Sequence, residues 1–389
     1  MTPRKLSPRL RPIAKSPIST KSTSAAYRSP GVYVQEVSSG PRRIAAAPTD
    51  VALFIGQTAI GAPLIPQTCT SESEFARHFG SGGTTDAMEH YVRLFFLNGG
   101  RRCVVIKLPG TSASDYSAAF AAVESAKIDF NLLVLVPEGA QAIETHYPAA
   151  SRFCREHEAL LLMDPPLAWT RAAIAVTDAK TRLTGVVGDY AAVYFPGLRL
   201  PGGRTLGAAG AVAGVVARTD HTRGVWKAPA GLEATIHGTV QAPDPLTRGE
   251  VDTLNPSGIN ALHIPRDQLV VWGARTWANQ GEFRYIPVRR LASHVKKSLA
   301  QGLSWVAFEP NTPTLWTEIR ACAENFLQGL FREGAFAGSS AREAYFVRCD
   351  RTTMSATDEA AGRVILDVAV SPLKPAEFIM LRLILQAAT

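Results

Sequence analysis

The sequence predicts an α/β and α+β multidomain protein: a central parallel-sheet region followed by a mixed α/β C-terminal region. Three observations support this fold class: the length, an alternation of apolar runs with helix-like segments, and a change of pattern in the last third. The 389 residues exceed the roughly 250–300 that a single core usually supports. Apolar residues make up 46% and charged residues 19%, which is typical of globular proteins rather than of disordered ones.

The central region is predicted from short apolar runs that alternate with amphipathic segments. The runs read as buried strands, and the segments between them carry apolar residues three or four positions apart, as helices do. Because parallel strands need helical crossovers, this alternation predicts a parallel sheet with helices on both faces. The expected strands are residues 51–56, 103–108, 131–136, 159–163 and 191–194, and the expected helices are residues 86–97, 114–125, 144–156, 172–182 and 208–218.

The sequence changes character on either side of this region. An additional strand is expected at residues 31–37, where apolar and polar residues alternate between Pro- and Gly-containing turns. Residues 220–262 are rich in Gly, Pro, Asn and Asp, which indicates loops. The last third predicts a mixed α/β domain, with strands at 268–271, 304–308, 345–349, 363–370 and 377–386 and helices at 286–301 and 314–332.

The positive charge is concentrated at the N-terminus. The chain has 41 Lys and Arg against 33 Asp and Glu, a formal charge of +8. Residues 1–30 hold seven bases and no acid, so the remaining chain is close to neutral. Residues 1–27 therefore indicate a flexible basic arm, with an organelle transit peptide as the less favoured reading. A nucleic-acid-binding surface is not favoured, because it needs bases clustered on a folded face.

Motifs for catalysis, cofactors and metals are not found. The five cysteines are scattered without a C-x-x-C pair, which fits a reducing compartment and offers no metal or disulfide framework. The sequence has no P-loop, no G-x-S-x-G elbow and no H-E-x-x-H. An α/β hydrolase with Asp164 or His157 near its site stays open as the alternative. A turn-forming role is favoured for Asp164, which opens an Asp-Pro-Pro sequence after a strand.

Several segments between residue 29 and the C-terminus carry distinctive motifs. The N-terminal ones are SPGVYVQEVSSGPR at 29–42 and PTDVALFIG at 48–56. The C-terminal third contains, for example, VWGART at 271–276 and WVAFEPN at 305–311. The other segments are residues 217–220, 224–229, 285–291, 315–316, 334–338, 344–350 and 375–379. In this order, and most densely in the C-terminal third, these segments resemble the contractile phage tail sheath family.

The resemblance implies a structural role rather than an enzymatic one. It implies a subunit that polymerises helically around an inner tube and contracts to drive the tube through a target envelope, as in phage tails, R-type tailocins and extracellular contractile injection systems. The middle domain would have a subtilisin-like fold without the catalytic triad. The implied parts are the basic arm 1–27, an N-terminal sheath segment 28–108, a middle α/β domain 109–262 and an inner, tube-facing domain 263–389.

The resemblance also implies partners and a location. The partners would be copies of the chain itself, the inner tube protein, the baseplate and a tail terminator or cap, with no direct nucleic acid, no membrane insertion and no cofactor. Assembly would take place in the bacterial cytoplasm, and the finished particle would be a phage tail or a released extracellular particle.

Two sets of contact residues follow from the resemblance. Terminal arms in this family donate strands to a neighbour's sheet, and pairing within the same chain is the alternative. The inner domain grips the tube loosely, for which screened charge pairs are suited, although a merely solvated helix face is equally compatible. The expected exchange residues are Val32, Tyr33, Val34, Gln35, Glu36, Val37, Phe378, Ile379, Leu381 and Leu383, and the expected tube contacts are Lys296, Lys297, Glu318, Arg320, Glu324 and Arg332.

Overall fold

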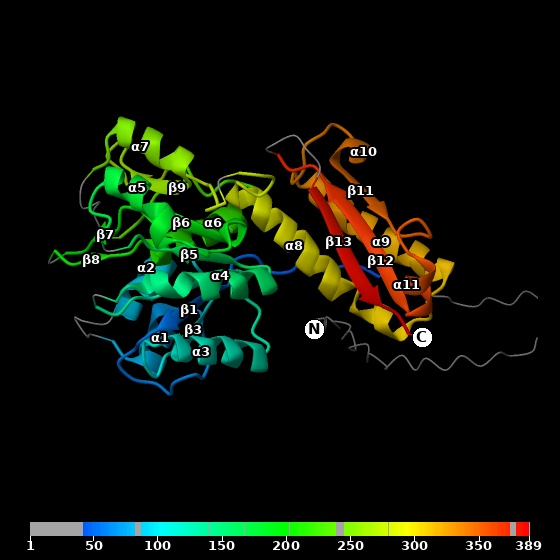
Figure 1. The fold of residues 1–389 in the computed structure, drawn as a ribbon, viewed down its shortest axis with the longest axis horizontal. Helices are drawn as coiled ribbons and strands as arrows, with labels where there is room; N and C mark the ends of the chain where they lie inside the picture. The colour runs from blue at the N-terminus through cyan, green and yellow to red at the C-terminus, as the bar shows by residue number, and fades with distance from the viewer. Residues whose placement is uncertain are drawn as a thin grey trace, which may run out of the picture. The chain divides into compact units, whose positions relative to one another are not determined.

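The computed structural model describes residues 42–81, 87–139, 141–166, 168–201, 203–238, 245–278, 280–373 and 379–388. They form a large eight-stranded sheet with helices on both faces, a three-stranded sheet packed on two long helices, and a two-stranded ribbon (Figure 1). The mixed α/β architecture with a mainly parallel central sheet is confirmed. The basic arm and the strand expected at 31–37 lie outside the described residues.

The large sheet has the strand order β10-β9-β6-β5-β4-β1-β3-β2. The six inner strands are parallel, and the two short edge strands, β2 and β10, are antiparallel to their neighbours. Its strands are β1 (Ala52–Gly56), β2 (Gln67–Cys69), β3 (Cys103–Lys107), β4 (Leu132–Leu135), β5 (Leu160–Met163), β6 (Ala191–Phe195), β9 (Ile259–His263) and β10 (Val270–Val271). A separate ribbon pairs β7 (Leu198–Arg199) with β8 (Thr205–Leu206).

Helices cover both faces of this sheet because alternate residues of each strand point into separate cores. On β1, Ala52 and Phe54 belong to one core, while Leu53 and Ile55 belong to the other. The first core is closed by α1 (Glu72–Phe79), α2 (Ala87–Leu97) and α6 (Ala209–Arg223). The second is closed by α3 (Ala113–Ser125), α4 (Tyr147–Glu156), α5 (Ala172–Arg182) and α7 (Arg248–Leu254).

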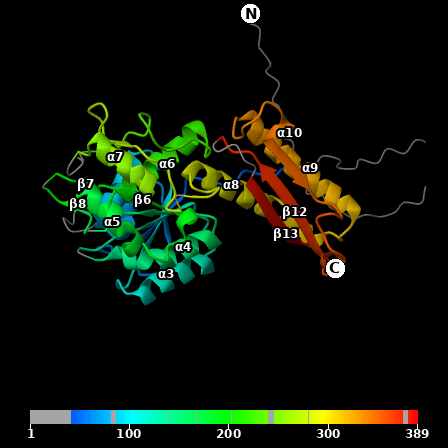
Figure 2. The same cartoon turned by 45° about the horizontal axis from the view of Figure 1, so that its top comes forward.

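The C-terminal region packs a three-stranded antiparallel sheet on two long helices. The strand order is β11-β12-β13, and α8 and α9 lie on one face of this sheet (Figures 1 and 2). The elements are α8 (Ile286–Gly302), α9 (Pro313–Arg332), α10 (Ala341–Ala344), β11 (Tyr345–Arg348), α11 (Ala356–Ala360), β12 (Arg363–Val370) and β13 (Ile379–Gln386). The 3-10 helices of the chain are η1 (Ile143–His146), η2 (Gly188–Tyr190), η3 (Asn255–Ser257) and η4 (Ser304–Phe308).

Two expectations differ from the structure. The strand expected at 304–308 is wrong, because these residues continue from the end of α8 as the 3-10 helix η4. The stretch expected to be loops contains α7 and β9, and α7 begins with a capping box between Thr247 and Glu250. The domain boundary expected at residue 108 stays a prediction; β1, which precedes it, pairs with both β3 and β4 in the large sheet.

None of the helices among the described residues has the length and apolar character needed to cross a membrane.

Helix α6 lies backbone to backbone against α2, which explains its Ala-, Gly- and Val-rich sequence. A Cβ atom on Gly210 would lie 2.6 Å from the carbonyl oxygen of Tyr91, and one on Gly214 would lie 2.4 Å from that of Phe95. Both distances are shorter than carbon–oxygen contacts allow, and the obstructing atoms belong to the main chain. Only glycine therefore fits at these two positions without moving α2.

We predict that Gly210→Ala lowers the free energy of unfolding by about 1–3 kcal/mol, because the added methyl group overpacks the α2–α6 contact. Gly249→Ala is the matched control, since Gly249 is also helical but has no atom within 4 Å of its added Cβ. The control should be stabilised by roughly 0.5–1 kcal/mol through helix propensity. Urea unfolding of both variants checks this, and equal stabilities would contradict the close contact.

Candidate functional site

Asp164 has a structural role at the start of α6. It is buried, and its Oδ1 accepts a hydrogen bond from the Ala209 amide at 2.8 Å, while Oδ2 accepts one from the Tyr91 hydroxyl at 2.7 Å. Burial raises the pKa of Asp164 to about 6, although the hydrogen bonds from Tyr91 and from the α6 amides oppose this shift. The carboxylate therefore binds the N-terminal end of α6, where a negative charge is favourable.

His157 lies among aromatic rings at the end of α4. Its ring centroid is 4.4 Å from that of Phe153 and 5.4 Å from that of Phe130, and its Nε2 lies 3.7 Å from a carboxylate oxygen of Glu124. These contacts are those of a half-buried packing residue. Among the described residues, no three or more His, Cys, Asp or Glu side chains lie close enough together to hold a metal ion.

The C-terminal strand pairs within its own chain. All eight residues of β13 are in register with β12, from Ile379 opposite Val370 to Gln386 opposite Arg363. The expected exchange residues Ile379, Leu381 and Leu383 are buried in the core that α8 and α9 share. Pairing within the same chain was the alternative to strand donation, and β13 has this pairing in the structure. The other expected exchange residues, Phe378 and residues 32–37, lie outside the described residues. In the described sheet, β13 pairs on one side only.

The segment that leads into β1 lies along α8. We call residues 42–50 the N-terminal strap. Ile44 packs against Gly302, where a Cβ would lie 2.6 Å from its side chain. The Ala47 amide donates to Ser298 Oγ at 2.9 Å, and Arg290 donates to the Thr49 carbonyl at 2.8 Å. The strap therefore follows α8 from its C-terminal end toward its N-terminal end.

The beginning of the strap and the end of the chain meet at Glu309. The Arg42 guanidinium lies 4.2 Å from the ring centroid of Trp305 and donates to a Glu309 carboxylate oxygen at 3.2 Å. The backbone amide of Ala388 donates to the Glu309 carbonyl at 2.9 Å. The segment that follows the expected N-terminal exchange residues and the segment that follows the C-terminal ones are thus held at one place in the C-terminal region.

The expected tube-contact residues fall into two groups. On α9, Glu318, Glu324 and Arg332 are exposed, whereas Arg320 donates to the Cys349 carbonyl and, at 3.1 Å, to Thr317 Oγ1. On α8, both lysines form ion pairs with the sheet region: Lys296 with Glu158, and Lys297 with Asp129 at 2.6 Å. The three exposed side chains of α9 are therefore accessible to a partner, whereas Arg320 and the two lysines of α8 bind groups of their own chain.

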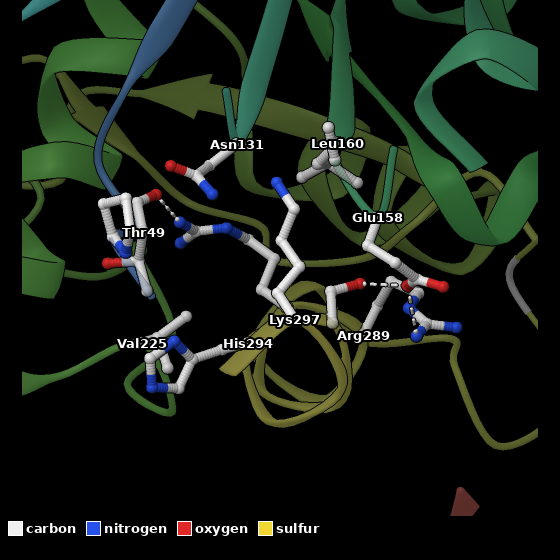
Figure 3. Close-up of a pocket in the computed structure, with 12 residues that line it drawn as sticks. Thr49, Asn131, Glu158, Leu160, Val225, Arg289, His294 and Lys297 are labelled. Atoms are coloured by element: carbon white, nitrogen blue, oxygen red, sulfur yellow. Dashed lines mark hydrogen bonds and ion pairs between the residues drawn. The ribbon is translucent and has the colours of Figure 1, made fainter. Parts of the chain in front are cut away.

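A cluster of buried charges joins α8 to the large-sheet region. Arg290 pairs with Asp220 of α6 through two contacts, at 2.5 and 2.8 Å, and both side chains are buried. Beside them, Glu158 accepts from Arg289 at 3.3 Å and from Ser293 at 2.9 Å, as well as from Lys296. We call this cluster, together with the Lys297–Asp129 pair, the α8 junction. Several of its members line a small pocket, in which Arg289 points toward Glu158 (Figure 3).

The pKa of Glu158 reflects this surrounding. Burial acts to raise its pKa, but the hydrogen bond from Lys296 and the positive charges of Arg289 and Lys296 outweigh burial. The net effect lowers the pKa below the ordinary glutamate value. The carboxylate is therefore ionised at neutral pH and binds the two bases of α8.

His294 lies at the contact between α8 and the strap. It is 8% exposed, and its Nδ1 has no hydrogen-bond partner among the described residues. Burial and the neighbouring Arg290 charge lower its pKa to about 4, although a hydrogen bond with the Ala47 backbone opposes the shift. The imidazole is thus neutral above pH 5 in the folded chain.

Sequence reasoning missed the α8 junction. Its bases form two adjacent pairs, Arg289-Arg290 and Lys296-Lys297, seven residues apart. This spacing places both pairs on nearly the same side of a helix, a signal that was available. Their acidic partners are distant in sequence, in α6 and before β4 and β5, so the partners could not be identified.

Two family models match the chain in succession. The phage tail sheath protein central domain matches residues 110–277, and the phage tail sheath C-terminal domain matches residues 279–386. The tail sheath protein of Vibrio phage KVP40 is 26% identical over 179 residues, which is 45% of this chain. The match spans about a quarter of that relative, 26% of its length.

Solved sheath structures match over almost the whole chain. A chain of the contracted sheath complex of the extracellular contractile injection system PVC is 27% identical, with a TM-score of 0.76 over 92% of this chain and 98% of its own. A chain of the contracted helical sheath of the anti-feeding prophage is 30% identical, with a TM-score of 0.73 over 92% of this chain and 99% of its own. A chain of the 6-fold symmetrised baseplate of the same system is also 30% identical, with a TM-score of 0.72 and the same coverage.

The two consecutive domain matches and the 30% identity across nearly complete sheath chains show that this chain belongs to the phage tail sheath protein family, whose members are structural subunits of contractile sheaths.

Proposed function

We propose that this protein is a structural subunit that polymerises helically around an inner tube and contracts to drive the tube through a target envelope. One observation carries the proposal. The chain aligns with 98–99% of two sheath chains that were solved in contracted assemblies. Neither residue of the hydrolase alternative supports that alternative, because Asp164 binds the start of α6 and His157 packs against Phe153 and Phe130.

Contraction would be driven by the lattice rather than by a bound nucleotide. Each subunit would have two packings against its neighbours, and the contracted packing would be lower in free energy. A few kcal/mol for each subunit, summed over many copies, would suffice to move the tube. The sequence contains no P-loop that would supply phosphate chemistry instead.

Neighbouring subunits would be joined by exchanged strands, with residues 32–37 as the N-terminal donor. The edge of β13 that is unpaired in the described sheet supports this arrangement, because an added strand could bond there along its main chain. Donation of β13 itself would require the whole β12–β13 ladder to re-form in another subunit. The meeting of the strap and the C-terminus at Glu309 supports one exchange site that involves both ends.

The division of the chain into parts is also proposed. Residues 1–27 would be a basic arm, residues 28–108 would begin the subunit, residues 109–262 would complete a subtilisin-like, non-catalytic α/β domain, and residues 263–389 would form the inner domain. The mainly parallel sheet supports the fold assignment of the middle domain.

The inner tube would contact the exposed face of α9. Its charges Glu318, Glu324 and Arg332 are exposed, and exposed charges give a loose, salt-screened contact that releases the tube. Arg320, Lys296 and Lys297 would contribute less, because each already has a partner within the chain.

The remaining partners and the location follow from the proposed role. Copies of the chain and the baseplate are the partners that the related structures support, and a tail terminator or cap would close the sheath. The subunit would have no direct nucleic-acid contact. It would assemble in the bacterial cytoplasm and then be part of a phage tail, a tailocin or a released extracellular particle.

The α8 junction would make the two regions of the subunit turn together. Its ion pairs join α8 to α6, to β4 through Asp129 and to β5 through Glu158. These ion pairs add little net stability, but their geometry is satisfied in one arrangement, so they would hold the two regions in fixed positions. Movement during contraction would therefore be expected at the exchanged strands rather than inside the subunit.

Negative-stain microscopy of the expressed full chain tests the proposed function, and hollow helical tubes are expected. Deletion of residues 28–38 should leave soluble particles that do not polymerise, because the proposed donor strand is lost. An equally long deletion of residues 5–15, in the basic arm, is the control and should still form tubes. Discrete particles from the full chain would favour the enzyme alternative, and normal tubes from the 28–38 deletion would refute strand donation.

Charge reversal on α9 tests the tube contact. With Arg332→Glu, sheaths should form while co-purification of the inner tube drops several-fold, and raising the salt concentration should weaken tube binding by the unaltered sheath as well. Arg342→Glu is the control, since Arg342 is an exposed base of α10. Equal recovery of tube with both variants would show that the exposed face of α9 is not the contact.

The folded chain should lose stability in mild acid because of His294, at the contact between α8 and the strap. The pKa of this buried group is lowered from 6.5 to about 4, so the stability that its neutral form contributes is present above pH 6.5 and is lost as the pH falls. From pH 7.5 to 5 the loss is about 2 kcal/mol. The raised pKa of Asp164 has the opposite effect on stability, because this group favours the folded chain as the pH falls. The effect of His294 must therefore be measured by comparing variants.

The measurement is urea unfolding at both pH values. His294→Gln should retain about 2 kcal/mol more of its neutral-pH stability at pH 5 than the unaltered chain. His237→Gln, at an exposed histidine, should behave as the unaltered chain does. The same pH dependence in all three proteins would exclude His294 as the acid-sensitive group.

A further inference from the structure

Two cysteines face each other at the edge of the large sheet. Cys69 of β2 lies directly opposite Cys103 of β3 in an antiparallel register, and the two side chains are hydrogen-bonded. Opposite residues of antiparallel strands have Cα atoms roughly 4.5–5.5 Å apart. A disulfide spans Cα distances of roughly 4.4–6.8 Å. The strand pairing alone thus brings the two sulfurs within bonding reach, although the cysteines are distant in sequence.

The two thiols differ in acidity: the pKa of Cys69 is lowered, whereas the pKa of Cys103 is raised. All five cysteines are free and buried. The hydrogen bond from Cys103 lowers the pKa of Cys69, while burial and the Glu74 charge oppose this shift and the Arg77 charge adds to it. The same hydrogen bond and burial raise the pKa of Cys103, and burial raises the pKa of Cys154, Cys322 and Cys349. Cys69 therefore has the greatest thiolate character, which is the reactive form.

Both thiols are buried, but the pair lies at the sheet edge, where local opening of β2 would expose it to solvent. Strand β2 has three residues, it pairs only with β3 in the described sheet, and its middle residue Thr68 is exposed. Short edge strands are among the first elements to open in native-state fluctuations. Cys154, in contrast, lies on α4 in the interior of the second core.

We propose that Cys69 and Cys103 are a redox site, which a small disulfide such as oxidised glutathione converts into an intrachain disulfide between β2 and β3. This proposal does not depend on the proposed function. The bond would close the segment that carries α1 and α2 into a covalent loop. It would thereby tie the outer edge of the sheet to an inner strand, and a reducing thiol would reverse it.

The reaction is balanced by two thiol–disulfide exchanges. The Cys69 thiolate attacks one sulfur of the small disulfide, forming a mixed disulfide and releasing the first thiolate. Cys103 then loses its proton to solvent, and its sulfur attacks Cys69 Sγ, which releases the second thiolate. The two protons that leave the cysteines end on the two small thiols, so one disulfide is reduced while one is formed.

The experiment treats the folded, full-length protein with oxidised glutathione and then alkylates the remaining thiols in denaturant. Free thiols should fall from five to three, and non-reducing peptide mapping should recover Cys69 linked to Cys103. Cys103→Ala should instead retain glutathione on Cys69, whereas Cys69→Ala should retain none on Cys103. Cys154→Ala is the control and should form the same link as the unaltered chain.

Thermal unfolding gives an independent readout. The linked chain should melt roughly 5 °C or more above the reduced chain, and dithiothreitol should abolish the difference. Five free thiols after treatment, or a link between other cysteines, would overturn the proposal. A link that forms only when the chain is refolded with oxidised glutathione would also overturn the reaction in the folded state.

Discussion

The buried pairing of Arg290 with Asp220 is the interaction on which the rest of the subunit depends. Both side chains are at least nine-tenths buried, and they join α8 to α6. Helix α8 also supports β13, the strap and the core of the C-terminal region. Removing one partner would leave an uncompensated charge out of water, so the position of α8 relative to the large sheet depends strongly on this pair, which is the most buried of the ion pairs at the junction.

This interaction specifies an arrangement more than it adds stability. A buried ion pair gives little net free energy over a well-packed apolar pair, since desolvation offsets the attraction. Its geometry is nevertheless demanding: the two guanidinium nitrogens meet both oxygens of Asp220, and one of them also reaches the Thr49 carbonyl. Apolar side chains at this place could slide, whereas this set of hydrogen bonds is satisfied in one position of α8 only.

How much could be read from the sequence depended on the range of the interactions. Buried runs such as Leu132–Leu135 and the strands β12 and β13 were predicted closely, because local alternation and apolar content determine them. The capping box of α7 is present in the sequence as Thr247-x-x-Glu250, but the Gly, Pro, Asn and Asp residues around it favour a loop prediction. The ion pairs of Lys296 and Lys297 could not be predicted, because their partners Glu158 and Asp129 are far away in the chain.

The meeting of Arg42, Glu309 and Ala388 has a mechanical consequence. A pull on the segment before Arg42 and a pull on the C-terminus would both be applied to the same few residues beside η4. Under the proposed strand exchange, tension between neighbouring subunits would be transmitted through this point of attachment. The eight-stranded sheet would then move with its subunit and would not lie between the two places where tension is applied. Its parallel strands would not need to resist shear when the proposed lattice rearranges.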